Sequence, residues 1–262
     1  MSKFNGNPIF YGTVTVAVLI ALIFASILVN PMPAQIASAA APAQTFSLFG
    51  PITSDQSAVK PTKTPAPLSS FFTDNFSNPN TLANNWQIVD ASPNWGGPSS
   101  WIVKNKQMQQ NSGIFFNGKN RFQVLEGTNL VSKAVEPIEF SYKVTFYTSM
   151  GKGGIGILFH YKDEQHYYRF VTVQNSSDGG PFRQLQAMVQ GNFVVLAQNN
   201  QGYDPAKPHT VIITIKNDNI SVAFDGKKQF TAPDGHDNAN GHVGLQTYAN
   251  HAAFTNLSVA RP

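Results

Sequence analysis

The strongest constraint on the fold is an unbroken two-residue alternation between positions 138 and 148. One set of alternating positions is apolar or aromatic: Ile138, Phe140, Tyr142, Val144 and Phe146. The other set is mostly polar: Glu139, Ser141, Lys143, Thr145 and Tyr147. Successive side chains of a strand point to opposite faces of its sheet, so this pattern predicts a half-buried β-strand covering a core.

Short apolar runs of the same kind follow along the rest of the chain. They predict strands over residues 155–161, 167–173, 182–189, 193–197, 209–216, 220–224, 229–231, 242–248 and 252–259. The polar links between them are typical of hairpins, and Phe254 and Leu257 fall out of phase, which predicts a bulge. Since no long stretch keeps a capped helical stripe, the chain is expected to be an antiparallel sandwich or barrel.

The first 39 residues have the composition of an export signal. Lys3 precedes an apolar run from Thr13 to Val29, and small residues follow at 37–39. Cleavage after Ala39 or Ala41 would release a secreted protein. Counted over residues 9–29, however, the run is long enough to remain as an uncleaved membrane anchor. Either outcome predicts an extracytoplasmic protein, and an anchor would be its only contact with a membrane.

Residues 40–70 are rich in Pro, Ala, Ser and Thr and have no sustained period. Such a segment cannot bury enough apolar surface to offset the entropy of ordering it, so we expect a disordered tether. Residues 71–262 then form a single domain large enough for one core. The chain has no Cys, so the stability of this domain must come from burial rather than from disulfides.

The charge distribution argues against nucleic acid as a partner. The formal net charge is +4 and the pI about 9.2, but the Lys and Arg residues are scattered along the sequence. A surface that follows phosphates needs clustered cations. The positive balance indicates mild attraction to acidic polysaccharide or to a cell surface.

Three groups of residues, in this order and spacing, are similar to a known family. They are Asp74-Asn75-Phe76 with Trp86 and Pro98-Ser99-Ser100-Trp101; residues 154–159 (GIGILF) with residues 167–170 (YYRF); and residues 241–245 (GHVGL) with residues 253–256 (AFTN). This region resembles the laminin G-like, concanavalin A-like jelly rolls, especially their thrombospondin C-terminal-like branch. The resemblance implies an all-β, two-sheet antiparallel jelly roll with one concave face, a fold that hosts lectins, adhesion modules, glucanases and carbohydrate-binding appendages.

The resemblance also implies one cofactor, a structural Ca²⁺. The family often holds this ion through a carboxylate in an Asp-Asn pair of the last strand, where this chain has Thr255-Asn256. A hydroxyl replaces the anionic ligand, so Asp74 and Asn256 are the remaining metal-ligand candidates. No other cofactor is expected.

The carboxylates do not match the catalytic pattern of glucanases with this fold. Those enzymes have Glu-x-Asp-x-x-Glu or a close variant on one strand, so that one acid protonates the leaving group while the other attacks the sugar. The four Glu residues are Glu126, Glu136, Glu139 and Glu164, and none has this spacing. We interpret Asp163-Glu164 as a solvated hairpin turn.

Two other motifs favour structural interpretations. Residues 151–156 formally match G-x-G-x-x-G, but a strand follows where a nucleotide site needs a helix, so they indicate a glycine-rich turn. Asp234, His236, Asp237 and His242 match no metal motif and are expected to lie in a polar surface loop.

A sugar site needs exposed aromatic rings beside polar side chains that can pair with hydroxyl groups. The candidates for this role are Trp95, Tyr168, Arg169, Arg183, Gln184 and Tyr203. Tyr168 shares a strand face with Phe170, so burial in the core is the alternative for it. Trp86 and Trp101 are expected in the core.

These features together predict an exported, noncatalytic binding module that recognises carbohydrate or an extracellular matrix or cell-surface polymer. One alternative is a polysaccharide hydrolase or lyase whose acids come from separate loops, such as Asp90, Asp178 and Asp204. A second alternative is a membrane-anchored structural envelope protein. The sequence does not indicate an oligomeric state.

Overall fold

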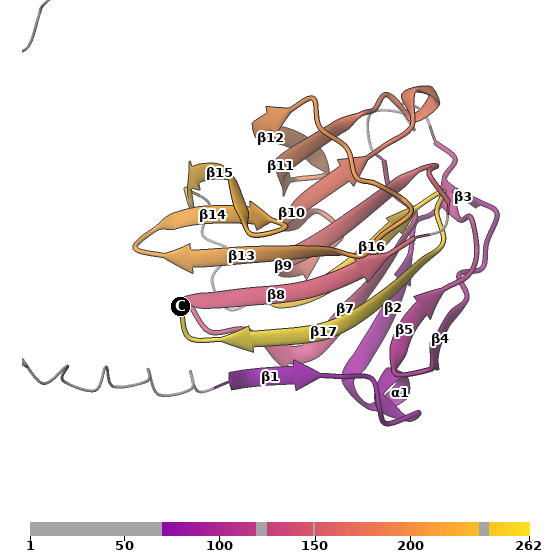
Figure 1. Ribbon diagram of the computed structural model, residues 1–262, viewed down its shortest axis with the longest axis horizontal. Helices are drawn as coiled ribbons and strands as arrows, with labels where there is room; N and C mark the ends of the chain where they lie inside the picture. Colours follow the sequence, from indigo (N-terminus) through magenta and orange to yellow (C-terminus); the bar gives the residue numbers. More distant parts are fainter. Residues whose placement is uncertain (1–69, 119–124, 149, 236–240) are drawn as a thin grey trace, which may run out of the picture. The chain divides into compact units, whose positions relative to one another are not determined.

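The computed structural model describes residues 70–118, 125–148, 150–235 and 241–262. They form two antiparallel sheets packed face to face, as the jelly-roll prediction required (Figure 1). The predicted signal or anchor and nearly all of the predicted tether lie outside the described residues. Within the described ranges, no helix has both the length and the apolar character needed to cross a membrane.

The first sheet has eight strands among the described residues, in the order β15-β14-β13-β8-β17-β5-β4, with β1 also paired to β17. Its strands are β1 (Ser70–Asp74), β4 (Trp101–Lys104), β5 (Gln107–Gln110), β8 (Phe140–Tyr147), β13 (His209–Lys216), β14 (Asn219–Phe224), β15 (Lys227–Pro233) and β17 (Ala252–Ala260).

In the described part of the chain, the second sheet has seven strands in the order β12-β11-β10-β9-β16-β7-β2. Its strands are β2 (Trp86–Asp90), β7 (Thr128–Val135), β9 (Gly154–Asp163), β10 (His166–Val173), β11 (Phe182–Val189), β12 (Asn192–Asn199) and β16 (His242–Tyr248). The short pair β3 (Asn94–Trp95) and β6 (Phe115–Phe116), the helix α1 (Thr81–Asn85) and the 3₁₀ turn η1 (Ser176–Asp178) complete the fold.

The core lies between the two sheets and follows the period-two pattern. In β8 the alternating residues Phe140, Tyr142, Val144 and Phe146 are fully buried, which confirms the predicted face. The same cluster contains Trp86 and Trp101, as expected. Ile138 is the exception: it precedes the start of β8 and is 64% exposed, because pairing with the neighbouring strands begins only at Phe140.

Local irregularities also follow the sequence. The pairing of β17 with β8 shifts register between Thr255 and Ser258, so the predicted bulge is confirmed. The glycine-rich segment leads directly into β9, as its strand-turn interpretation required. Gly153 has φ +65°, and a Cβ there would lie 2.0 Å from the Tyr248 carbonyl oxygen, so only glycine fits.

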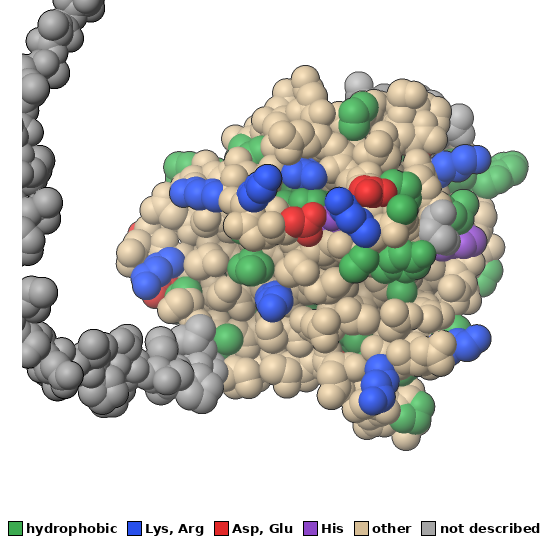
Figure 2. All heavy atoms as spheres, viewed as in Figure 1, with side chains coloured by type: hydrophobic (Ala, Val, Ile, Leu, Met, Phe, Trp, Pro, Cys, Tyr) green, Lys and Arg blue, Asp and Glu red, His purple; other side chains and the backbone are tan. Residues whose placement is uncertain are grey.

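On the face shown in Figure 2, the Lys and Arg side chains are spaced apart and form no continuous stripe. This view agrees with the scattered cations of the sequence.

Candidate functional site

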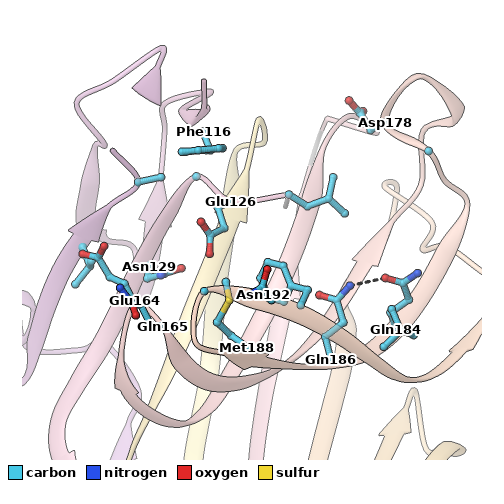
Figure 3. A pocket seen from close by; sticks show the side chains of 18 of the residues that line it. Phe116, Glu126, Asn129, Glu164, Gln165, Asp178, Gln184, Gln186, Met188 and Asn192 are labelled. Carbon is cyan, nitrogen blue, oxygen red and sulfur yellow. Dashed lines mark hydrogen bonds between the residues drawn. The ribbon is translucent and has the colours of Figure 1, made fainter. Parts of the chain in front are cut away.

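The face of the seven-stranded sheet that points away from the core, here called the outer face, contains a pocket of about 860 Å³ (Figure 3). Gln184, Gln186 and Met188 of β11 and Asn129 of β7 line it, together with Phe193 of β12. Strand alternation explains this placement, because the intervening residues of β11, Leu185 and Ala187, point into the core. Phe116 of β6, Asp178 of η1, and Glu126 and Glu164 between strands also line it.

Arg169 of β10 lies fully buried beneath the pocket. Its Nε donates to Gln186 Oε1 at 2.7 Å, and its Nη1 donates to Gln246 Oε1 at 2.8 Å and to the Leu125 carbonyl oxygen at 3.1 Å. The ring of Phe193 covers the guanidinium, with the ring centroid 3.8 Å from Cζ. These three acceptors are neutral, an aromatic face packs against the buried cation, and the charge of Glu126 acts on it from nearby.

The hydrogen bonds continue outward from Arg169 through side-chain amides. Gln186 donates to Gln184 at 2.5 Å, and Gln184 donates to Gln198 at 3.1 Å. On the other side, Gln246 donates to Asn129 at 2.8 Å. We call Arg169 with these five amides the amide ladder. Because a guanidinium can only donate, it fixes the orientation of each amide in turn, and such chains polarise one another.

Gly156 of β9 makes the ladder possible. It pairs with Gln246 on β16 and with Val171 on β10, so it lies on the strand that the Arg169–Gln246 bond must cross. A Cβ at this position would lie 2.5 Å from Gln246 Oε1. The absence of a side chain lets Gln246 lean across β9 toward Arg169.

An apolar strip runs beside the ladder on the same face. It consists of Val131, Leu158, Tyr161, Tyr167 and Met188, with Val89 and Phe193 packed against them. The rings of Tyr161 and Tyr167 stack with centroids 5.4 Å apart. The five residues of the strip are buried, whereas Val89 and Phe193 are half-buried, so the outer face presents polar groups of fixed orientation next to these two apolar side chains.

Glu126 lines the pocket and is hydrogen-bonded to Tyr167 of the apolar strip. Burial raises its pKa, the hydrogen bond from Tyr167 and the charge of Arg169 oppose that shift, and the charge of Glu164 adds to it. Tyr167 donates its hydroxyl to Glu126 Oε1 at 2.6 Å, and burial raises the pKa of Tyr167 well above its usual range. Glu126 therefore holds a proton, or accepts one, more readily than a surface glutamate.

The structure brings two of the six predicted sugar-site residues to this pocket. Gln184 lines it, and Arg169 anchors the ladder beneath it. Trp95 is 64% exposed, as expected, but it lies on β3 and does not line the pocket.

The other three predictions are corrected. Tyr168 is fully buried in the core between the sheets, because it shares the inward face of β10 with Phe170. Tyr203 is also buried there, and its hydroxyl accepts a hydrogen bond from Asn250 at 3.0 Å. Arg183 faces away from Gln184: it donates to the Gly202 carbonyl oxygen and lies 3.7 Å from the ring centroid of Phe224.

Of the acids expected to act from separate loops, only Asp178 lines the pocket, and its carboxylate accepts the Gly153 N–H at 2.8 Å. Asp90 accepts the Ser99 N–H, and Asp204 accepts the Ala206 N–H. Sequence reasoning missed Glu126, Asn129, Gln186 and Gln246. Gln186 has the same strand phase as Gln184, which was an available signal, whereas residues 128–135 were not recognised as a strand.

The two metal-ligand candidates do lie together. Asp74 and Asn256 both line a hollow of about 390 Å³ where β1 pairs with β17. Asp74 already accepts hydrogen bonds from Thr81 Oγ1 at 2.5 Å, Phe76 N at 2.8 Å and Trp86 Nε1 at 3.0 Å. It is the only carboxylate among the described residues of that hollow, so the set fits Ca²⁺ poorly, and the ion stays a prediction.

A second buried polar centre lies at one end of the sandwich. The imidazole of His160 is in hydrogen-bond contact with Glu136 through Nδ1 and with Asp234 through Nε2, the latter at 3.2 Å. Burial lowers the pKa of His160, but the bonds to Asp234 and Glu136 outweigh it and raise the pKa to about 9. Asp234 was expected in a polar surface loop, and this contact corrects that expectation; His236 and Asp237 lie outside the described residues. Within the described ranges, no three His, Cys, Asp or Glu side chains are arranged to share a metal ion.

Comparison with known proteins places the fold among jelly rolls. The chain is similar to the carbohydrate-binding module CBM66 from Bacillus subtilis (17% identity, TM-score 0.52, covering 67% of this chain and 94% of the module). It is also similar to the β-glucanase of Bacillus licheniformis (14% identity, TM-score 0.51, covering 73% of this chain and 97% of the glucanase). A third similar structure is a Bacillus subtilis protein of unknown function with a galectin-like fold (9% identity, TM-score 0.55, covering 74% of this chain and 96% of that protein).

These identities establish the fold alone. No curated protein sequence matches the chain significantly. The family model of the 3-keto-alpha-glucoside-1,2-lyase-like domain matches residues 77–260, which is most of the chain and all of its outer-face pocket. The chain therefore belongs to the 3-keto-alpha-glucoside-1,2-lyase-like domain family.

Proposed function

We propose that the chain binds saccharides in the outer-face pocket and acts as a recognition module for a glycan or an extracellular polymer outside the cytoplasm. The observation behind this proposal is that Gln184 and Gln186 of the amide ladder line the pocket together with the half-buried apolar side chains of Val89 and Phe193. Sugar rings have apolar C–H faces and many hydroxyl groups, and this combination of surfaces complements both.

The amides favour sugars for a second reason. Each side-chain amide can both donate and accept, so it can pair with a hydroxyl group in either sense. Because Arg169 holds Gln186 in place and Gln186 in turn donates to Gln184, little side-chain freedom of these pocket-lining amides is lost when a ligand binds.

The charges around the pocket favour neutral sugars over acidic ones. Glu126, Glu164 and Asp178 line it, and its described lining includes no Lys, Arg or His side chain. The net positive charge of the whole chain therefore does not extend to this site.

The test is a glycan array followed by calorimetric titration of the full chain with a sugar that binds. Gln184→Ala should weaken binding roughly three- to tenfold, because it removes a pocket-lining hydrogen-bonding group. Lys228→Ala, an exposed change on β15 of the opposite sheet, is the matched control and should have no effect. Unaltered affinity in Gln184→Ala would place the site elsewhere.

A second candidate function is cleavage of a keto-sugar glycoside, favoured by the family match together with the environment of Glu126. A ketone at C3 acidifies the hydrogen at C2. A base that removes this proton lets the C–H electrons form a C1=C2 double bond while the C1–O bond breaks, and the departing oxygen takes up a proton. Burial raises the pKa of Glu126, which makes its carboxylate a stronger base for this step, and Tyr167 fixes its position.

Incubating the full chain with a 3-keto-α-glucoside and following release of the alcohol separates the two functions. If the second candidate is right, Glu126→Gln should lower the rate by roughly a hundredfold or more while the substrate still binds. Binding without turnover in the wild-type chain would leave recognition as the function and contradict the cleavage proposal.

Export through residues 1–39, the choice between cleavage and anchoring, and kinship with the thrombospondin C-terminal-like branch stay proposals. Cell fractionation with sequencing of the mature N-terminus tests the first two. A soluble form beginning near Ala40 supports secretion, and a full-length form that needs detergent for extraction supports an anchor.

A further inference from the structure

We infer that the ligand of the outer face is an oligosaccharide of at least two sugar rings, which occupies two adjoining hollows with Glu164 at their junction. This inference rests on the proposed saccharide binding and goes beyond it, because it specifies the size of the ligand, its path and an additional contact residue.

A second hollow of about 450 Å³ lies on the same face, beside the pocket described above. Gln87 of β2, Lys133 of β7 and Lys162 of β9 line it, and none of these lines the first pocket. Val89 and Glu164 line both hollows. The two depressions therefore share a boundary.

The floor is continuous from one hollow to the other. Asn129 lines the first, and the next outward-facing residues of β7, Val131 and Lys133, line the second. From Asn129 to Lys133 the strand advances about 13 Å. Val131, Tyr161 and Met188 of the apolar strip are buried beneath this path, and the apolar side chain open to a sugar face at the boundary is the half-buried Val89, which lines both hollows.

The two ends of this path differ in charge, which gives a bound chain a direction. The described lining of the first hollow has only acidic charged groups, whereas the second includes Lys133, Lys162 and His242 as well as Asp163. Lys133 donates to the Ala83 carbonyl oxygen at 2.7 Å, so its stem is held against the edge of the hollow. An oligosaccharide bound in the reverse direction would place each of its ends in the hollow of the other charge character.

Glu164 lies where the linkage between two rings has to pass. It is exposed in the β9–β10 turn, so its carboxylate can accept hydrogen bonds from hydroxyls on both sides of the boundary. Its charge also acts on Glu126, which places the two carboxyl groups around the same region. The predicted solvated hairpin turn is confirmed by its exposure, and Glu164 within it is assigned here as a ligand contact.

The experiment is calorimetric titration of the full chain with glucose, maltose and maltotriose, and with cellobiose and cellotriose as the β-linked series. In the series that binds, the second ring should raise affinity roughly tenfold. Gln87→Ala and Lys162→Ala should each remove roughly three- to tenfold of the disaccharide affinity and leave glucose binding unchanged. Glu164→Gln should likewise affect the disaccharide more than glucose.

The alternatives are distinguishable. Equal affinity for one ring and two, or an equal loss for glucose and disaccharide in Gln87→Ala, would overturn the two-hollow inference and leave saccharide binding intact. Failure of every sugar to bind would overturn both. Lys228→Ala again serves as the control, and thermal melts verify that each variant is folded.

Discussion

Arg169 and His160 are both buried in this domain, and the protein surrounds them differently. Arg169, on the outer face, donates to the amide oxygens of Gln186 and Gln246 and to a backbone carbonyl. His160, at one end of the sandwich, lies between the carboxylates of Glu136 and Asp234. The three acceptors named for Arg169 are neutral, whereas both contacts of His160 are with acidic side chains.

This difference indicates that the surroundings of Arg169 can serve ligand binding, whereas the contacts of His160 serve stability. Amides that are oriented by a cation still present donors and acceptors to a ligand, and an arginine stays charged across the physiological pH range. A histidine between two carboxylates is fully engaged with its partners and titrates. Binding at the outer face should therefore depend little on His160, whereas stability should depend on both centres.

The largest effect is expected at Arg169. Arg169→Met should lower the free energy of unfolding by about 3 kcal/mol, because it leaves the oxygens of Gln186 and Gln246 buried without their donor. Urea unfolding measures this change, and Arg261→Met, an exposed substitution, is the control. A loss below about 1 kcal/mol would mean that these bonds merely offset the cost of burying the charge.

The next largest effect is a change of stability with pH, which we expect from the titration of His160. Its folded pKa of about 9 lies above the ordinary value of 6.5, so its stabilising contribution is complete below about pH 6.5 and is lost as the pH rises through 9. Between pH 6.5 and 10 the wild-type chain should lose about 2 to 3 kcal/mol of unfolding free energy.

His160→Asn should be less stable at pH 6.5 and should show a flatter profile. Asn suits the left-handed backbone at this position, where φ is +50°. The exposed change His166→Asn is the matched control and should retain the wild-type profile. A pH dependence that survives in His160→Asn would assign it to other groups.

A smaller effect is expected at Gly156. Gly156→Ala should cost about 2 kcal/mol, because the new methyl group collides with Gln246 and breaks the ladder across β9. Gly113→Ala is the comparison, since a Cβ at that position meets no atom within 4 Å. Equal stability of the two variants would show that Gln246 can move without disturbing Arg169.

The smallest effect on stability is expected at the outer end of the ladder. Gln184→Ala should change the free energy of unfolding by about 0.5 kcal/mol, whereas Gln186→Ala should cost about 1.5 kcal/mol, because Gln186 bonds Arg169 directly. Chemical denaturation of both variants measures the gradient. A reversed order would contradict a network that is anchored at Arg169.

The fold was predictable because burial alternates in nearly every long strand. Phe140, Val144 and Ile213 follow this rule, and each is fully buried. Residues 128–135 escaped prediction because their buried run, which includes Asn129 and Ser132, has no clear alternation of polarity. In this strand both faces are covered, one by the core and the other by the amide ladder and the apolar strip.

The site was harder to predict because the same residue types serve both faces. Arg169 and Arg183 lie on adjacent strands and each follows an aromatic residue, yet one faces the pocket and the other the core side. Tyr167 and Tyr168 are neighbours in the sequence, but Tyr168 packs in the core between the sheets and Tyr167 in the apolar strip of the outer face. Only the phase of the strand relative to the core distinguishes them. The partners of Arg169 come from segments up to 77 residues away, and their pairing cannot be read locally.

Hydrogen–deuterium exchange of the full chain, with and without a saturating oligosaccharide, tests the binding face most directly. We expect slower exchange in residues 125–133, 156–167 and 182–193, and unchanged exchange in β13, β14 and β15. Protection confined to those three strands of the opposite sheet, at a sugar concentration that saturates binding, would contradict the assignment of the outer face.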